Sequence, residues 1–226
     1  MTIDEIYQLI LYSTAKNLSQ GYVSPDDFNI TINQAQKSYA SYLLGSFQTY
    51  TPGRSIARVE FGQNTVVRTR LAPIIYWYNL NVDTAGFSPY PGDYLQVDAM
   101  VSIYGYNRIR SVQQDSLYSY HNSAIDPVAT NPIYILEDNG FRFFPENISQ
   151  AKLSYVRNPP EMRWGYTIDP ITGIPVYDPS PSVSYQPVWD DASILEIIVR
   201  ALAIIGVNLQ QNTVEQYSMA IKNQGQ

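Results

Sequence analysis

The sequence predicts an α+β protein in which helices at both ends of the chain enclose a long β-rich middle. Three observations support this fold class. Apolar residues recur at helical spacing near the two ends, they alternate with polar residues in the middle, and the middle is punctuated by Pro and Gly. We expect an N-terminal helical hairpin at 1–47, a β-rich insertion or arm with hairpins at 48–187, and C-terminal helices at 188–226. At 226 residues the chain is long enough to bury a substantial core.

The first predicted helix begins at a capping box. The Thr2 hydroxyl can accept from the Glu5 N–H and the Glu5 carboxylate from the Thr2 N–H, which satisfies two donors that a helix end leaves open. An apolar stripe at helical spacing follows and ends near 18–21. The stripe contains Ile3, Ile6, Leu9 and Ile10.

A second helix is predicted to begin at Ser24 and to end at Gly45. Ser24 suits the N-cap, and Pro25 suits the first helical position because its missing N–H has no partner there in any case. Gly45 is a typical residue just beyond a C-terminus. Because the link between the two helices is short, we expect them to form an antiparallel hairpin.

The middle of the chain is predicted to contain strands at 94–104 and 151–157. In the first, apolar side chains alternate with polar ones, which is typical of a strand with one buried face. The segment 65–78 is expected to be extended in part, with an interruption at Pro73, and 79–91 is expected to be a loop. The predicted apolar face of 94–104 consists of Leu95, Val97, Ala99, Val101 and Ile103.

Two hairpins are predicted from turn residues. Asn139-Gly140 suits the positive φ angles of a type I′ turn, so 133–144 should be a hairpin. A second hairpin at 166–177 should turn through the segment 169–173, which contains Pro and Gly.

Helical periodicity returns after Pro187. Asp190 can cap a helix with a wide apolar face, which Gly206 is expected to end. Asn212 is then expected to cap a short final helix. The prediction is therefore a bundle of four helices, two from each end, from which the β-rich region projects. The apolar face consists of Ile194, Leu195, Ile197, Ile198, Leu202 and Ile205.

Composition narrows the function classes. The formal net charge of −6 argues against tight nucleic-acid binding by the whole surface. The longest apolar stretch, 194–205, is too short and too charged to span a bilayer, and the acidic first residues do not resemble a secretory signal. The absence of cysteine excludes disulfides and thiolate sites, and it fits assembly in a reducing cytoplasm. The 20 tyrosines suit either a β-rich domain or surfaces that become interfaces.

Charge is distributed unevenly along the chain. From Arg54 to Arg110 there are six basic and four acidic residues, whereas from Pro159 onward there are three basic and seven acidic residues. This is either ordinary surface variation or an acidic face that meets a basic face on a neighbouring subunit.

Several short motifs along the chain have a characteristic sequence. The first helical region contains Ser24-Pro25-Asp26-Asp27-Phe28-Asn29 and Asn33-Gln34-Ala35-Gln36. The other end contains Tyr185 through Trp189-Asp190-Asp191, Glu196-Ile197-Ile198, Arg200-Ala201-Leu202, Ile205-Gly206-Val207-Asn208-Leu209 and Val214-Glu215-Gln216-Tyr217. The middle contains Pro91-Gly92-Asp93-Tyr94-Leu95 and Leu153 through Pro160. Together these motifs resemble the head–tail connector proteins of crAss-like and related Bacteroidetes phages, most strongly in the terminal helices, over roughly a third of the chain.

The resemblance implies a virion structural protein without enzymatic activity or cofactor. Such proteins form rings, commonly twelve-fold, which stack under the portal and extend the channel for DNA. The implied partners are further copies of the chain, the portal protein and neighbouring neck or tail rings, while genomic DNA passes without specific binding. The virion would be assembled in the host cytoplasm. The other readings are a different tail component and a carbohydrate- or receptor-binding virion protein.

The expected contacts with a neighbouring ring or subunit concentrate in the segment 54–78. Four arginines and three consecutive aromatic residues occupy a stretch with little reason to fold alone. The candidate residues are Arg54, Arg58, Arg68, Arg70, Tyr76, Trp77, Tyr78 and, near the C-terminus, Tyr217.

Three chemical alternatives remain open. A Ser–His–Asp arrangement around His121 would use Asp115 or Asp126, but the local run has no strand–turn–helix elbow. A calcium site or a carboxylate pair would draw on Asp169, Asp178, Asp190 and Asp191, which turns and a helix cap explain better. Sugar stacking would need exposed aromatic residues, for which the candidates are Tyr76, Trp77, Tyr78, Tyr104, Tyr106 and Trp164.

Overall fold

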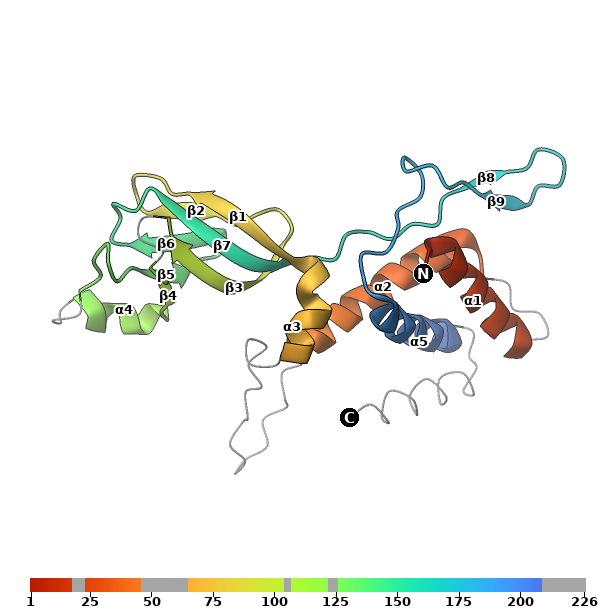
Figure 1. Ribbon diagram of the computed structural model, residues 1–226, viewed down its shortest axis with the longest axis horizontal. Coiled ribbons are helices and arrows are strands. Elements are labelled where there is room, and N and C mark those ends of the chain that lie inside the picture. Colours follow the sequence, from red (N-terminus) through yellow and green to blue (C-terminus); the bar gives the residue numbers. More distant parts are fainter. Residues whose placement is uncertain (18–22, 46–64, 104–106, 122–125, 209–226) are drawn as a thin grey trace, which may run out of the picture. The chain divides into compact units, whose positions relative to one another are not determined.

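The computed structural model describes residues 1–17, 23–45, 65–103, 107–121 and 126–208, and it confirms an α+β fold (Figure 1). The chain divides into two compact units. A helical unit combines Met1–Pro73 with Pro159–Gln226, and a sandwich unit consists of Ile74–Asn158. This division differs from the predicted boundaries at 47/48 and 187/188, because residues 65–73 and the hairpin at 166–177 both belong to the helical unit.

The helical unit begins with two capped helices. Both bonds of the predicted capping box form: the Thr2 N–H donates to Glu5 Oε2 over 2.8 Å, and the Glu5 N–H donates to Thr2 Oγ1 over 3.3 Å. The Ser24 Oγ accepts from the Asp27 N–H over 3.1 Å, and Gly45 follows the second helix with a φ of 91°. These local predictions are confirmed. The elements of this unit are α1 (Ile3–Asn17), α2 (Pro25–Leu44), α3 (Thr65–Leu71), η1 (Ala72–Ile74), β8 (Tyr166–Ile168), β9 (Pro175–Tyr177) and α5 (Asp191–Asn208).

Helix α5 packs against α2 and α1 (Figure 1). Tyr39 lies at the centre of the contact with α2: it is fully buried, and its hydroxyl is 2.9 Å from Ser193 Oγ. The predicted stop at Gly206 is wrong, because α5 continues to Asn208 and Gly206 is buried within it. A glycine inside a helix costs only about 1 kcal/mol, which packing of the apolar face can offset. The predicted final helix after Asn212 lies outside the described residues.

The expected extended segment at 65–78 is helical in its first half. Helix α3 contains three β-branched residues near its start, which favour strands. Tertiary contacts outweigh that preference, since Leu71 is fully buried and the Arg70 guanidinium pairs with Glu196 of α5 over 3.2 Å. Pro73 lies in η1, and the extended part of the segment starts only at Ile75.

The sandwich unit consists of two antiparallel-rich sheets that enclose one apolar core (Figure 1). One sheet has the order β1-β7-β3 and the other the order β2-β6-β5-β4, in which only the β4–β5 pair is parallel. The core includes Leu80, Met100, Tyr134, Phe141, Phe143, Leu153 and Tyr155, which come from both sheets. The elements are β1 (Ile75–Asn81), β2 (Phe87–Pro89), β3 (Tyr94–Ser102), β4 (Arg110–Ser111), α4 (Gln114–His121), β5 (Ile133–Leu136), β6 (Gly140–Phe144) and β7 (Gln150–Arg157).

Strand β3 is present as predicted, but its predicted apolar face is wrong. Two register shifts, between Tyr94 and Gln96 and between Val97 and Ala99, each insert an extra residue opposite β7. Each bulge exchanges the two faces of the strand, so simple alternation does not hold along it. As a result Met100 is buried in the core, whereas the side chain of Leu95 is exposed.

The β5–β6 hairpin is confirmed, but its glycine serves close packing. Gly140 is not among the glycines with positive φ, so the predicted type I′ turn is wrong. A Cβ atom at Gly140 would lie 2.2 Å from the Ser88 carbonyl oxygen and 2.7 Å from the Phe87 ring. Gly140 therefore lets β2 approach β6.

We predict that Gly140→Ala destabilises the sandwich unit by about 1–3 kcal/mol, because β2 must move away from β6. Gly92→Ala is the matched control, since a Cβ there meets nothing within 4 Å. Urea denaturation of both variants checks the prediction. Equal unfolding midpoints for the two variants would contradict it.

Candidate interaction surface

Three consecutive aromatic residues are exposed on β1. Tyr76, Trp77 and Tyr78 have between 45% and 52% of their surface accessible. Successive side chains of a strand point to opposite faces, so burying all three within this chain would require cover on both faces. Strand β1 lies at the end of its sheet, and no other described strand pairs with its second edge.

A cation lies over an aromatic ring on each face of this strand. Lys152 Nζ is 5.1 Å from the centre of the Trp77 ring, and Arg157 Cζ is 5.8 Å from that of Tyr76. Such contacts contribute about 0.5–1 kcal/mol at exposed sites and hold the rings in place. The Arg157 Nε is buried and has no hydrogen-bond partner within the described part of the chain. We call these five residues, Tyr76, Trp77, Tyr78, Lys152 and Arg157, the aromatic edge.

The backbone of β1 also has an open side. The Val82 N–H donates to the Ser149 carbonyl over 3.0 Å, so Val82 and Ser149 form a hydrogen-bonded pair at the end of the ladder between β1 and β7. Because hydrogen-bonded pairs alternate in an antiparallel ladder, the main-chain groups of Trp77 and Asn79 point away from β7. The aromatic edge therefore offers both rings and backbone groups to a further strand.

The buried Tyr155 supports the aromatic edge from within the sandwich, and the half-buried Tyr94 lies beside it. Tyr155 pairs with Tyr76 across the strands, and its hydroxyl donates to Asp93 over 2.7 Å. Burial, followed by this bond to a carboxylate, raises the pKa of Tyr155. Burial and the neighbouring Tyr90 raise the pKa of Tyr94 to about 12. Both hydroxyls therefore stay protonated at neutral pH and give the edge an uncharged support.

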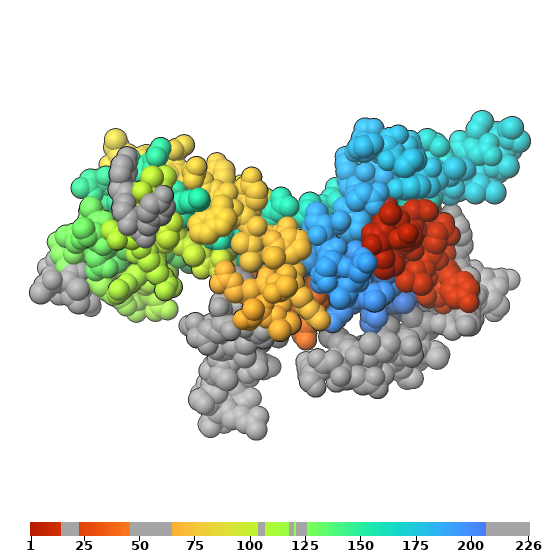
Figure 2. Space-filling model, viewed as in Figure 1, coloured from red at the N-terminus to blue at the C-terminus, as the bar shows by residue number. Residues whose placement is uncertain are grey.

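A second exposed surface lies on the β8–β9 hairpin of the helical unit. The hairpin is confirmed, and Gly173 takes a φ of 67° in its turn. Four aliphatic side chains on it are between 51% and 92% exposed, with Ile171 at the tip the most exposed. In the space-filling view the far end of the hairpin projects beyond the helices of its own unit (Figure 2). The four residues are Ile168, Ile171, Ile174 and Val176.

The base of this hairpin is anchored by Trp164. Its ring is 4.3 Å from the Tyr7 ring and 5.7 Å from the Tyr177 ring, and its Nε1 donates to Asp4 over 2.8 Å. Trp164 is only 3% exposed, so its predicted exposure for sugar stacking is wrong. The anchoring holds the hairpin base on α1.

Side-chain amides of α2 hold the segment 160–164, which leads into the hairpin. Asn33 forms two bonds with the backbone of Met162, to its N–H over 2.9 Å and to its carbonyl over 2.7 Å. Asn29 forms the same two bonds with Trp164, over 2.7 and 3.2 Å. Gln36 donates to the Pro160 carbonyl over 3.0 Å. The three residues lie on one helix face and replace a neighbouring strand, and we call them the amide ladder.

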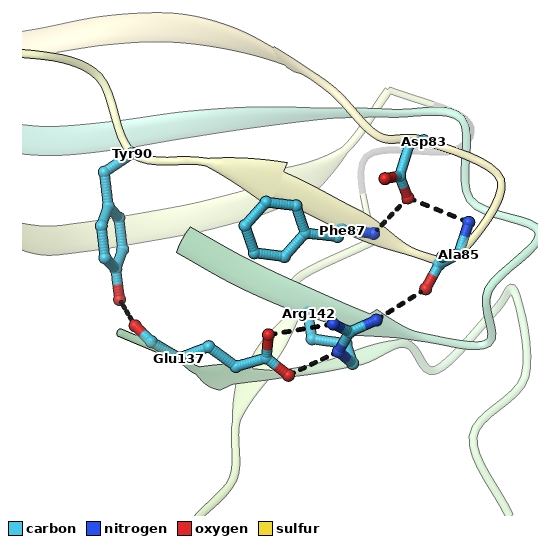
Figure 3. A network of polar contacts seen from close by, with 6 residues as sticks. All are labelled: Asp83, Ala85, Phe87, Tyr90, Glu137 and Arg142. Atoms are coloured by element: carbon cyan, nitrogen blue, oxygen red, sulfur yellow. Dashed lines mark hydrogen bonds and ion pairs between the residues drawn. The ribbon is translucent and has the colours of Figure 1, made fainter. Parts of the chain in front are cut away.

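A connected polar cluster of the sandwich unit surrounds Arg142 (Figure 3). Its guanidinium binds both carboxylate oxygens of Glu137 and the Ala85 carbonyl, and it lies 5.6 Å from the Phe87 ring. Asp83 accepts from the Ala85 and Phe87 N–H groups. These groups bond one another, so the cluster fixes the turn before β2 and is structural.

The predicted contact residues fall into three groups. Tyr76, Trp77 and Tyr78 lie on the exposed aromatic edge. Arg68 is exposed on α3, and Arg70 pairs with Glu196 within the chain. Both arginines belong to the helical unit and the three aromatics to the sandwich unit. Arg54, Arg58 and Tyr217 lie outside the described residues.

The acidic residues considered for a metal have structural partners. Asp169 accepts from the Ile171 N–H and the Thr172 hydroxyl, and these bonds lower its pKa. Asp178 caps the turn at Ser180 in the same way, which lowers its pKa too. Among the described residues no three His, Cys, Asp or Glu side chains are grouped so as to hold a metal. His121 ends α4, and its side chain is outside the description.

The sequence predicts the hairpin at 166–177, but its exposed aliphatic surface and the amide ladder were not predicted. The surface could have been found from the aliphatic residues on both sides of the Pro–Gly turn.

Neither a scan against protein-family models nor a search of curated proteins finds a match for this chain. No helix in the described ranges is long and apolar enough to cross a membrane.

Proposed function

We propose that this chain is a virion structural protein, one subunit of a ring in the head–tail connector of a tailed phage. The observation that carries the proposal is the presence of two unlike exposed apolar surfaces, the aromatic edge and the hairpin, on separate compact units. A closed ring needs a heterologous interface, in which each subunit contributes two different patches. The resemblance of the terminal helices to connector proteins supports the same role.

In this proposal the terminal helices form a bundle that makes the body of the ring, and the sandwich unit projects from it. The contact of α5 with α2 and α1 supports the bundle. The ring would contain about twelve copies, as the resemblance implies. Its partners are the portal protein and the adjacent neck or tail rings.

The proposed conduit passes DNA without binding it specifically. A net charge of −6 suits that task, because an anionic lumen does not hold phosphates. The role is structural, needs no cofactor and is carried out in the virion, after assembly in the host cytoplasm.

We predict that the double variant Trp77→Ala/Tyr78→Ala loses assembly while the monomer keeps its fold. Truncating an aromatic anchor in an interface costs at least about 2 kcal/mol, so the dissociation constant should rise by about 30-fold or more. Sedimentation velocity measures assembly, and far-UV circular dichroism checks the helices.

The matched control is Trp77→Tyr/Tyr78→Phe, which keeps two rings on β1 and should assemble. If the alanine variant assembles with the same concentration dependence as the wild type, the aromatic edge is not a subunit contact. Loss of helical signal would instead show that these exposed residues maintain the fold, which also contradicts the prediction.

A carbohydrate- or receptor-binding role is the second candidate. The half-exposed Tyr76, Trp77 and Tyr78 favour it, because aromatic faces stack on sugar rings. The buried position of Trp164 removes one of the platforms that this role would use. Binding of the purified chain to a glycan array, with loss of binding in the alanine variant, would support this role over the ring.

A further inference from the structure

We propose that the β8–β9 hairpin of one copy docks on the aromatic edge of the next copy and extends the sheet of β1. This inference rests on the proposed ring and names the two surfaces that meet in it. The chemistry is β-strand addition, in which backbone bonds give affinity and side-chain contacts give specificity.

The hairpin has the properties of an inserted element. Two-stranded hairpins are at best marginally stable alone, and exposed aliphatic side chains add a cost in water. Here the strands are three residues each, and four aliphatic side chains lie on or between them. The base, in contrast, is fixed by Trp164 and by paired backbone bonds between Arg163 and Tyr185 of 3.1 and 2.9 Å. A rigid base with an uncovered apolar tip suits docking into another molecule.

The aromatic edge has the complementary properties. Its free main-chain groups at Trp77 and Asn79 can pair with a strand, and its rings can cover aliphatic side chains. An open edge of this length is a liability that proteins usually cover or pair. No described element of this chain pairs with it.

The hairpin and the aromatic edge carry charges of opposite sign, which favours contact between them. The segment from Trp164 to Asp178, which contains the hairpin, carries two acidic residues, Asp169 and Asp178, and no Lys or Arg. Lys152 and Arg157 make the aromatic edge basic, and the buried Arg157 Nε lacks a partner among the described residues. Within the sandwich unit Asp93 and Asp98 accept from the hydroxyls of Tyr155 and Ser154. An acidic aliphatic hairpin therefore meets a basic aromatic edge.

The absence of cysteine from the chain permits a direct test. One variant carries Ile171→Cys at the hairpin tip, and a second, size-tagged variant carries Asn79→Cys on β1. The two are mixed in equal amounts and oxidised, both alone and with the portal protein of the same genome. Each molecule has one thiol, so a tagged–untagged disulfide reports contact between copies. Gln34→Cys, exposed on α2, replaces Ile171→Cys in the control mixture.

The proposal predicts that the tagged–untagged dimer is the main oxidised product and exceeds the control by at least about ten-fold. Lys152→Glu in the Asn79→Cys chain should lower the yield several-fold, and Lys152→Arg should retain it. A yield equal to the control would overturn the proposal.

The same samples are imaged by negative stain, which separates this proposal from the ring itself. Rings without the disulfide would contradict hairpin docking and leave the connector function standing. The disulfide without rings would support docking and contradict ring closure. If neither rings nor the disulfide form, with or without the portal protein, the result contradicts both the docking and the connector function.

Discussion

Trp164→Ala is expected to lower the stability of the helical unit by about 3–5 kcal/mol. The indole is buried between Tyr7 and the hairpin tyrosines, so truncation leaves a large cavity. It also removes the donor to Asp4, which then keeps an unpaired, partly buried oxygen. A loss of this size is a large part of the roughly 5–15 kcal/mol that stabilises a typical domain.

Trp77→Ala is the matched control, because it removes the same side chain from an exposed site. Without a cavity its effect on monomer stability should stay below about 1 kcal/mol. Urea denaturation followed by far-UV circular dichroism compares the two variants. Similar unfolding midpoints would show that Trp164 is not the anchor of the hairpin.

Asn33→Ala is expected to destabilise the helical unit by about 2–4 kcal/mol. The substitution leaves the N–H and the carbonyl of Met162 without their partner, at about 1–3 kcal/mol for each buried group. Alanine is the better helix former, but its advantage is only about 0.6 kcal/mol and does not offset the loss.

Gln34→Ala tests whether the effect belongs to the ladder and not to the helix. Gln34 is the next residue of α2 and is exposed, so its replacement should change stability by less than about 0.5 kcal/mol. Hydrogen exchange at the Met162 amide provides a local measurement. Unchanged protection of that amide in the Asn33 variant would contradict the ladder.

The features that the sequence predicts correctly are local ones. The capping box at Thr2 and Glu5 and the caps at Ser24 and Gly45 depend on groups within a few residues, so their bonds follow from spacing alone. The same holds for the turn at Gly173. Such signals need no knowledge of what packs against them.

The features that it predicts wrongly depend on the rest of the fold. The bulges in β3 follow from its pairing with β7, and the helical form of α3 follows from burial of Leu71. The space beside Gly140 is set by β2, which is distant in sequence. Trp77 lies between two tyrosines in the sequence and is exposed, whereas Trp164 lies between Arg163 and Gly165 and is buried, so tertiary surroundings decide the exposure of each.

The candidate site shows the same division. The run Tyr76-Trp77-Tyr78 is visible in the sequence, and its exposure on an edge strand comes from topology. Asn29, Asn33 and Gln36 share a helix face at spacings of four and three residues, which the sequence displays. The segment that they bind could not be identified from the sequence, because they bind main-chain groups, which do not depend on residue type.

Negative-stain imaging of the purified chain, alone and mixed with the portal protein of the same genome, tests the proposed function most directly. The connector proposal predicts closed rings of the chain, or added density below the portal, with a symmetry that the images give. Dispersed monomers in both samples, together with specific binding on a glycan array, would contradict the ring and favour the receptor-binding role.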